Sequence, residues 1–147
     1  MAIKYDYVIG IDPGISTGVC KFKEGLLVES LTLSPLNAIS LVMDSKDCLI
    51  VIEDSRMQSY LFTGDKLNEQ ERLKIARNVG MVDLICKLIV DTAKEVGVKL
   101  VTISPQSKGK KIKSNKELEK LTGLSVSCNN QHERDAFKLA YLYRNVK

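Results

Sequence analysis

Short apolar-rich segments separated by polar turns open the chain. They predict three strands, at about Tyr5–Ile11, Ser16–Phe22 and Leu26–Leu33. The links between them, Asp12–Ile15 and Lys23–Gly25, are short enough for hairpins. We therefore expect three antiparallel strands in one sheet.

A helix, a buried strand and a long helix are predicted next. Ser34 is suited to be an N-cap and Pro35 to the first helical position of "SPLNAISLVMDS". The uninterrupted apolar run "CLIVIE" indicates a strand buried on both faces. The long helix, from about Asn68 to Val96, carries two apolar stripes, so a second face is covered by a partner, a second copy or the chain's own loops. The stripes run through Met81, Leu84, Ile85 and Leu88, and through Ile75, Val79, Val82, Cys86 and Val90.

The last third of the sequence predicts one more strand, "VKLVTIS", and two helices. A short helix is expected near Ser114–Leu121 and a closing helix from about Gln131 to Tyr143. Asn130 is a candidate N-cap for the closing helix, with Glu133 as its capping-box partner. The order βββαβαβα predicts a single α/β domain over residues 1–147, with a mixed five-stranded sheet and helices on both faces.

Composition agrees with a globular domain, because 44% of the residues are hydrophobic and 27% are charged. No apolar run reaches the roughly 18 residues of a membrane span, and the N-terminus lacks a secretory signal pattern. We expect a cytoplasmic protein, in the bacterial host if the chain is phage-encoded. The four cysteines form no C-x-x-C pair, which indicates reduced thiols rather than a zinc site. Cys128, in a polar run, is the one we expect to be exposed.

Positive charge is concentrated towards the C-terminus. Residues 96–147 hold 11 lysines and arginines against four acids, a net of +7, whereas residues 1–95 hold 11 against 14, a net of −3. Much of the excess lies in "SKGKKIKSNKELEK", Ser107–Lys120. Such a segment is either a solvated loop or a phosphate-binding surface, because clustered cations release counterions from nucleic acid. Charge alone does not separate these two interpretations.

Three acids and the single histidine stand out from their surroundings. Asp12 ends the first strand, and Glu53 ends the buried strand "LIVIE", where a charge is costly without a cation or several donors. Asp135 lies in the first turns of the last helix, three residues after His132 and so on the same face. If the first strand and the "CLIVIE" strand are neighbours, Asp12 and Glu53 lie side by side. The closing helix then lays His132 and Asp135 across them.

Carboxylates crowded in this way repel one another unless a divalent cation neutralises them. Oxygen ligands favour Mg²⁺ or Mn²⁺ over zinc, and paired ions of this kind serve phosphodiester hydrolysis. Each residue also has an ordinary interpretation: Asp12 as a turn former, Glu53 as a rim charge, His132 as a surface residue and Asp135 as a partner of the helix dipole. Their combination, in this order, favours the metal site.

The segments "IGIDPGISTGVCKF", "LIVIEDSRM", "NVGMVDLI" and "HERDAFKLAY" resemble the RuvC-type Holliday junction resolvases of the RNase H-like superfamily, from about Tyr7 to Tyr143. The chain is compact for that family and closer to its phage-type or viral-type versions. The resemblance implies that Asp12, Glu53 and Asp135 are catalytic carboxylates that bind two Mg²⁺ or Mn²⁺ ions. It implies that His132 is a fourth ligand or a proton-transfer partner. It further implies a homodimer that nicks two strands of a four-way DNA junction symmetrically.

The resemblance also indicates where DNA would be contacted. In relatives, the loop after the central glutamate opens the junction, and here that loop reads "DSRMQSYLFTGDK". Its large side chains stack on bases, or they simply anchor the loop. The candidate DNA-binding residues are Arg56, Met57, Tyr60 and Phe62 in this loop, and Lys108, Lys110, Lys111, Lys113 and Lys116 in the basic segment.

The sequence therefore predicts a structure-selective endodeoxyribonuclease that resolves branched DNA junctions by metal-dependent paired nicking. Two alternatives stay open: an RNase H-like nuclease that processes structured RNA, and a non-catalytic junction-binding module. Actin-like and sugar-kinase ATPases also begin with a strand, an aspartate and a glycine-rich turn, but they need a second domain that 147 residues do not supply. We expect no membrane partner and no small-molecule cofactor.

Overall fold

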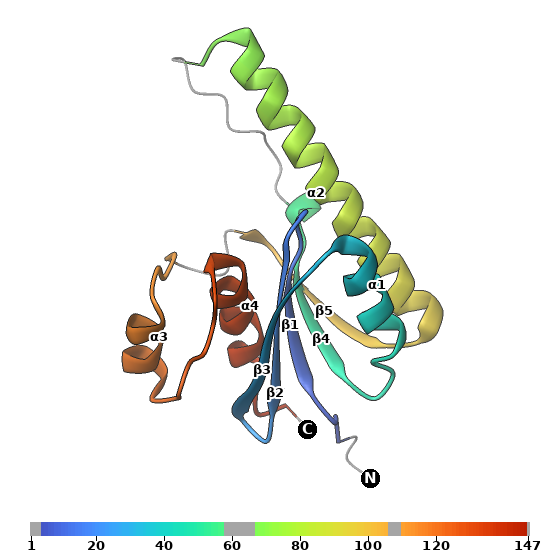
Figure 1. Cartoon of the computed structure of the whole chain (residues 1–147). Coiled ribbons are helices and arrows are strands. Elements are labelled where there is room, and N and C mark those ends of the chain that lie inside the picture. Colours follow the sequence, from blue (N-terminus) through green and yellow to red (C-terminus); the bar gives the residue numbers. More distant parts are fainter. Residues whose placement is uncertain (1–3, 58–66, 106–109, 147) are drawn as a thin grey trace.

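The computed structural model describes residues 4–57, 67–105 and 110–146. Five strands form one mixed sheet in the order β3-β2-β1-β4-β5, and helices cover both of its faces (Figure 1). The strands are β1 Val8–Asp12, β2 Thr17–Lys23, β3 Leu26–Leu33, β4 Leu49–Glu53 and β5 Lys99–Ile103. The helices are α1 Pro35–Met43, the short 3₁₀ helix η1 Ser55–Met57, α2 Glu69–Val96, α3 Asn115–Thr122 and α4 Gln131–Leu142.

The predicted sheet is confirmed in its topology. β1, β2 and β3 pair antiparallel, whereas β4 pairs parallel with β1 and with β5. The helices α1 and α2 supply the crossovers that parallel pairing requires. Two helices follow β5, where the sequence analysis expects a short helix near Ser114–Leu121 and a closing helix, although the order βββαβαβα counts only one of them. The pairing of β1 with β4 brings the carboxyl ends of these two strands together.

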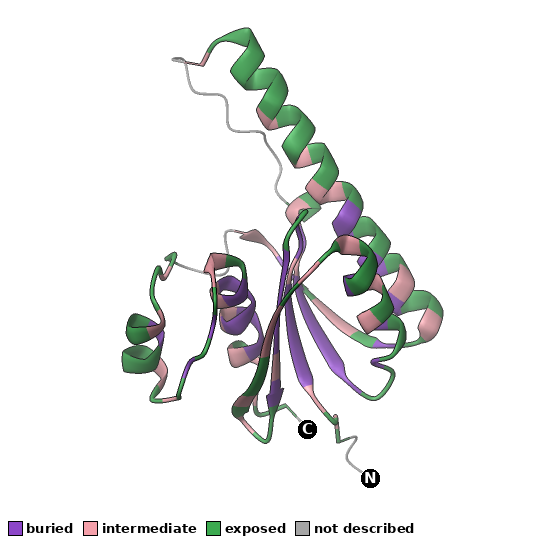
Figure 2. Ribbon diagram, in the orientation of Figure 1, coloured by how far each residue is buried: buried purple, intermediate pink, exposed green. Residues whose placement is uncertain are grey.

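Alternation along the central strands divides the core between the two faces of the sheet. Val8 packs beneath α4, whereas Ile9 and Ile11 pack beneath α1 and α2. In β4, Val51 faces α4 and Ile52 faces the opposite layer. The central strands are buried on both sides (Figure 2), which explains why "CLIVIE" lacks an alternating pattern. The same alternation directs Asp12 and Glu53, the last residues of β1 and β4, towards α4.

The helix α2 extends well beyond the sheet (Figure 1). It begins with a capping box, in which Asn68 Oδ1 accepts from the backbone N–H of Glu71 and Glu71 accepts in return. Its buried residues all lie in the second half, from Ile85 to Ala93. The first half is mostly exposed (Figure 2). Both predicted stripes contribute to the core, through Ile85 of one and Cys86 and Val90 of the other. Met81, Leu84 and Leu88 remain exposed in the single chain.

The closing helix α4 lies directly on the backbone of the sheet. A Cβ atom added at Gly10 of β1 would lie 2.1 Å from the carbonyl oxygen of Ala136. A Cβ atom added at Gly18 of β2 would lie 2.0 Å from the carbonyl oxygen of His132. No side chain fits at such distances, so these two glycines set how closely α4 approaches.

The expectation that Cys128 is exposed is wrong. All four cysteines are buried, and the Sγ atom of Cys128 lies 3.9 Å from that of Cys20. The extended segment before α4 directs Val126 and Cys128 into the α4-side core. Alternate side chains of this segment point inwards, so its exposed polar residues gave a misleading local composition.

In the described part of the chain, no helix has the length and apolar composition that crossing a membrane requires.

We predict that Gly10→Ala lowers the free energy of unfolding by about 2–3 kcal/mol, because the new methyl group overlaps helical backbone that cannot move independently. Urea unfolding followed by circular dichroism measures this loss. Ser125→Ala, at an exposed position outside the helices and strands, is the matched control and should change stability by less than about 0.5 kcal/mol. Equal stability of the two variants would contradict the close approach of α4.

Candidate active site

A row of residues crosses the sheet near the carboxyl ends of β1, β4 and β5. Thr32 of β3 pairs with Gly18 of β2, and Gly18 pairs with Asp12 of β1. Because Ile11 pairs with Ile52 in the parallel ladder, the following residues, Asp12 and Glu53, are neighbours. Alternation places both of these carboxylates on the face that α4 covers.

The first turn of α4 brings the single histidine to this row. Asn130 is the N-cap, and its Oδ1 accepts from the backbone N–H of Glu133 at 3.0 Å. The Nδ1 atom of His132 then lies 3.5 Å from Oδ2 of Asp12. The His132 side chain is 50% exposed and the Asp12 side chain 15% exposed. The imidazole thus has one side towards a carboxylate and the other open to solvent.

Asp135 lies one turn further along α4 and is 7% exposed. Its Oδ1 accepts from Gln131 Nε2 at 2.9 Å, and Gln131 Nε2 also donates to the carbonyl oxygen of Ile112 at 2.8 Å. Gln131 therefore connects Asp135 to the segment that precedes α3. This bond fixes one carboxylate oxygen of Asp135 near the start of the helix.

The structure gathers the four predicted site residues only in part. The neighbouring positions of Asp12 and Glu53 and the contact of His132 with Asp12 agree with the sequence analysis. Among the residues that the structure describes, however, no group of three His, Cys, Asp or Glu side chains is arranged to hold a metal ion. Carboxylates repel one another, so closing Asp12, Glu53 and Asp135 around one point needs a cation between them.

Glu133 has a structural role that the sequence analysis missed. It is 1% exposed, and Thr32 Oγ1 donates to its Oε2. The backbone N–H and the side-chain amide of Asn129 donate to its Oε1 at 3.1 and 3.2 Å. The predicted capping box expected a bond from the N-cap backbone at Asn130, but the bond comes from Asn129. Only the spacing of Asn130 and Glu133 was visible in the sequence, and it gave no sign of Thr32.

Arg56, predicted to contact DNA, is bound to a neighbouring acid. Its Nε and Nη2 atoms donate to the two carboxylate oxygens of buried Asp54, at 3.0 and 2.8 Å. These bonds lower the pKa of Asp54 below its usual range. Ser55 Oγ donates to Asp83 of α2 at 2.6 Å. The turn that follows Glu53 is therefore held by the Arg56–Asp54 pair within it and by the bond from Ser55 to α2.

The predicted basic surface is only partly described. Lys110, Lys111 and Lys113 precede α3 and Lys116 lies on it, and all four are exposed. Lys138 of α4 donates to the carbonyl oxygen of Lys110 at 2.5 Å, which connects this segment to the closing helix. The other predicted DNA-binding residues, Tyr60, Phe62 and Lys108, lie outside the described residues.

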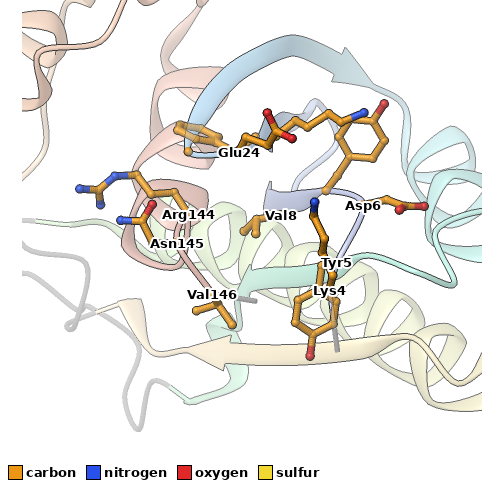
Figure 3. A pocket seen from close by; sticks show the side chains of 12 residues that line it. Lys4, Tyr5, Asp6, Val8, Glu24, Arg144, Asn145 and Val146 are labelled. Carbon is orange, nitrogen blue, oxygen red and sulfur yellow. The ribbon is translucent and has the colours of Figure 1, made fainter. Parts of the chain in front are cut away.

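A cleft of about 780 Å³ lies at the opposite end of the sheet (Figure 3). It is bounded by the start of β1, the β2–β3 turn and the residues after α4, with Lys4, Glu24 and Arg144 among its lining side chains. The carboxylates at the ends of β1 and β4 do not line it. The candidate active site therefore does not coincide with this cleft.

We predict that Arg56→Gln lowers the free energy of unfolding by about 1 kcal/mol at pH 7, because buried Asp54 loses a bidentate cation. The pKa of Asp54 is lowered in the folded state, so its stabilisation exists above the unfolded pKa of about 4 and is lost as pH falls through the native value. The unfolding free energies of the variant and the wild type, measured with urea, should therefore converge as pH falls below the lowered native pKa of Asp54. Lys87→Gln, which breaks an exposed ion pair with Asp91, is the control, and a pH-independent loss in Arg56→Gln would contradict the prediction.

Comparison with known proteins gives fold-level similarity. No protein-family model matches the sequence and no curated protein matches it. T. thermophilus RuvC, solved in complex with a Holliday junction substrate, is 15% identical, with 95% of this chain and 92% of RuvC covered and a TM-score of 0.59. The yeast mitochondrial Holliday junction resolvase Ydc2 is 13% identical, with 97% and 86% covered and a TM-score of 0.42. The sheet order, the covering helices and the likeness to RuvC together show that this chain shares the α/β fold of T. thermophilus RuvC.

Proposed function

We propose that this protein is a divalent-metal-dependent endonuclease that resolves four-way DNA junctions by paired nicking. The observation that carries the proposal is the neighbouring position of Asp12 and Glu53 at the ends of β1 and β4, with His132 of α4 against Asp12. This arrangement stands on the fold that the chain shares with RuvC. The RuvC structure contains a Holliday junction, which supports branched DNA as the substrate class.

The chemistry of the donor set fits a hard divalent cation. Asp12, Glu53 and Asp135 offer carboxylate oxygens, which Mg²⁺ and Mn²⁺ prefer, and His132 adds an imidazole nitrogen. Bound there, such ions would supply the water activation and charge stabilisation that phosphodiester hydrolysis requires. Closing the site needs the carboxylate of Asp135 to turn from Gln131 towards the strand ends. The Gln131–Asp135 bond joins a neutral amide to a carboxylate, so breaking it costs about 1.5–3 kcal/mol.

The side chains of the chain itself have separate tasks in this proposal. Asp12 and Glu53, on adjacent strands, would hold the ion from the edge of the sheet. His132 is half exposed beside Asp12, so its imidazole can take a proton from the attacking water or give one to the leaving group. Asp135, on α4, completes the donor set from above the sheet.

The exposed lysines before and on α3 would hold the DNA backbone. Lys110, Lys111, Lys113 and Lys116 lie on a segment fastened to α4 through Lys138, so their ammonium groups are positioned relative to the site. Such contacts give affinity without sequence preference. The pair with Asp54 uses two of the five guanidinium N–H groups of Arg56, so Arg56 could also contact a phosphate without opening the pair.

We further propose a homodimer formed through α2. Met81, Leu84 and Leu88, of the stripe that also contains buried Ile85, are 41%, 55% and 42% exposed, and Leu73 on the same side of α2 is 53% exposed. Gly80 lies within this stripe, and a Cβ atom added there meets nothing within 4 Å. A glycine inside a helix costs about 1 kcal/mol relative to alanine. We propose that it is present here because a second helix packs closely against α2 at this position. Two copies related by a two-fold axis would present two sites, one for each nicked strand.

We predict that Asp12→Asn abolishes cleavage of a synthetic four-way junction in Mg²⁺ or Mn²⁺ while junction binding stays within about threefold of the wild type. The amide keeps the shape of the carboxylate but not its charge, so the donor set loses a ligand. Cleavage is measured on labelled junctions by denaturing electrophoresis, and binding by gel shift in Ca²⁺. Asp6→Asn is the matched control, since Asp6 is an exposed acid before the other end of β1.

Three outcomes would contradict the proposal in different ways. Intact junction with the wild-type protein across several metals and sequences would refute the nuclease. Faster cleavage of structured RNA than of junctions would favour the RNA-processing alternative. Loss of binding in Asp12→Asn would mean that Asp12 is structural.

We predict that the wild type sediments as a dimer and that Leu84→Glu weakens association by at least tenfold, because a charge is placed in an apolar interface. Sedimentation velocity over a range of protein concentrations measures the shift. Leu142→Glu, at an equally exposed leucine at the end of α4, is the control and should leave the dimer intact. A monomeric wild type, or equal effects of the two variants, would contradict association through α2.

A further inference from the structure

Buried Glu133 holds a carboxylate inside the protein without a cation among its described partners. It accepts hydrogen bonds from the hydroxyl of Thr32, from the backbone and side chain of Asn129, and from the side-chain amide of Asn130. All of these donors are neutral. Its position in the first turn of α4 adds the favourable end of the helix dipole. These interactions stabilise the buried carboxylate, but its desolvation still costs free energy.

Helix capping alone does not explain this acid. The Asn130 side chain already accepts from the backbone N–H of Glu133, so the cap is formed without the carboxylate. What the carboxylate adds is the bond from Thr32, which lies on β3 at the edge of the sheet. Strands lie about 4.8 Å apart, so this contact is roughly 10 Å from β1 and from Asp12. Glu133 therefore joins the start of α4 to the sheet at a distance from the candidate active site.

The start of α4 meets three successive strands along one row of paired residues. On β3, Thr32 donates to Glu133. On β2, Gly18 lies directly beneath the backbone of His132 and Glu133. On β1, Asp12 lies 3.5 Å from the imidazole of His132. Thr32, Gly18 and Asp12 are register partners across the sheet, so an anchor at the first point fixes the helix at the third.

We infer that Thr32 and Glu133 are positioning residues, which hold the first turn of α4 across the sheet so that His132 and Asp135 stand over Asp12 and Glu53. This inference rests on the proposed function for its consequence, the formation of the metal site. Neither residue touches the donor set through its own side chain. They act through the backbone of α4. Gly18 lets the helix contact β2 but forms no side-chain bond with it, so the Thr32–Glu133 bond is what would keep α4 from sliding along the sheet.

The anchor makes a specific demand on its two members. Thr32 must donate a hydroxyl proton, and residue 133 must reach it with an acceptor while also accepting from Asn129. Glutamine keeps the length of the side chain and one carbonyl oxygen, so Glu133→Gln retains part of the anchor. Alanine removes it entirely. Thr32→Val is the sharpest change, because it keeps the shape of the side chain and deletes the hydroxyl group.

The experiment measures Mn²⁺ affinity by the electron paramagnetic resonance signal of the free ion. Partners outside the first coordination shell commonly change metal affinity by 10- to 100-fold, so we expect a loss of at least tenfold in Thr32→Val and Glu133→Ala. We expect Glu133→Gln to stay within about threefold of the wild type. Thr92→Val is the matched control, since Thr92 donates within α2 to Leu88 on the other side of the sheet. Circular dichroism verifies that each variant is folded.

A second measurement follows His132 without metal. It is the only histidine of the chain, so its imidazole protons give isolated nuclear magnetic resonance signals. At one fixed pH, these signals should move in Thr32→Val and Glu133→Ala and stay in place in Thr92→Val. This measurement reports the position of the helix whether or not the wild type binds Mn²⁺.

The outcomes separate this inference from the proposed function. If the wild type binds Mn²⁺ no better than Asp12→Asn does, the proposed metal site fails, and the imidazole signals alone decide whether the anchor exists. If the wild type binds Mn²⁺ and both Thr32→Val and Glu133→Ala match its affinity, the positioning role is overturned while the metal site stands. Unchanged imidazole signals in both variants would overturn the inference in either case.

Discussion

Backbone contact between α4 and the sheet is the constraint on which the rest of the structure depends. The helix passes so close to β1 and β2 that Gly10 and Gly18 leave no room for a side chain. This approach buries Phe137 and Ala140 against the sheet. It also lowers the helix far enough for a side chain from its first turn to reach the end of a central strand. Without it, the two halves of the candidate active site would stay on separate layers.

Strand pairing supplies the other half of this arrangement. Because α1 crosses over one face, β4 returns parallel to β1, and both strands end at the same edge. The two-residue period of a strand then directs their final carboxylates to the face under α4. The β1–β2 hairpin continues the same row on the other side. Three elements far apart in sequence thus meet through one register and one helix packing.

Local sequence patterns were sufficient for most of the fold. Ser34, Asn68 and Asn130 mark the starts of three helices because capping is a local interaction. The apolar run of β4 and the acid that ends it were also visible locally. The mixed sheet followed from the order of the elements, since a hairpin meander extended by helical crossovers has few alternatives.

Contacts between residues distant in sequence escaped prediction. Glu133 was assigned to capping, because its bond to Thr32 spans 101 positions. Cys128 was placed on the surface, because composition does not reveal which residues of an extended segment point inwards. In each case the deciding partner becomes visible only when the chain is folded.

The unequal burial of α2 has a consequence for the order in which the molecule opens. Its second half is fixed by Ile85, Ile89 and Ala93 against the sheet, whereas the first half is held by its capping box and its own backbone bonds. Amide protons near Leu73 should therefore exchange with solvent by local fraying, and those near Ile89 only when the core opens. A segment that frays easily can adjust its angle to whatever it meets at little cost in free energy. The first half of α2 can thus change its orientation while the second half stays packed against the sheet.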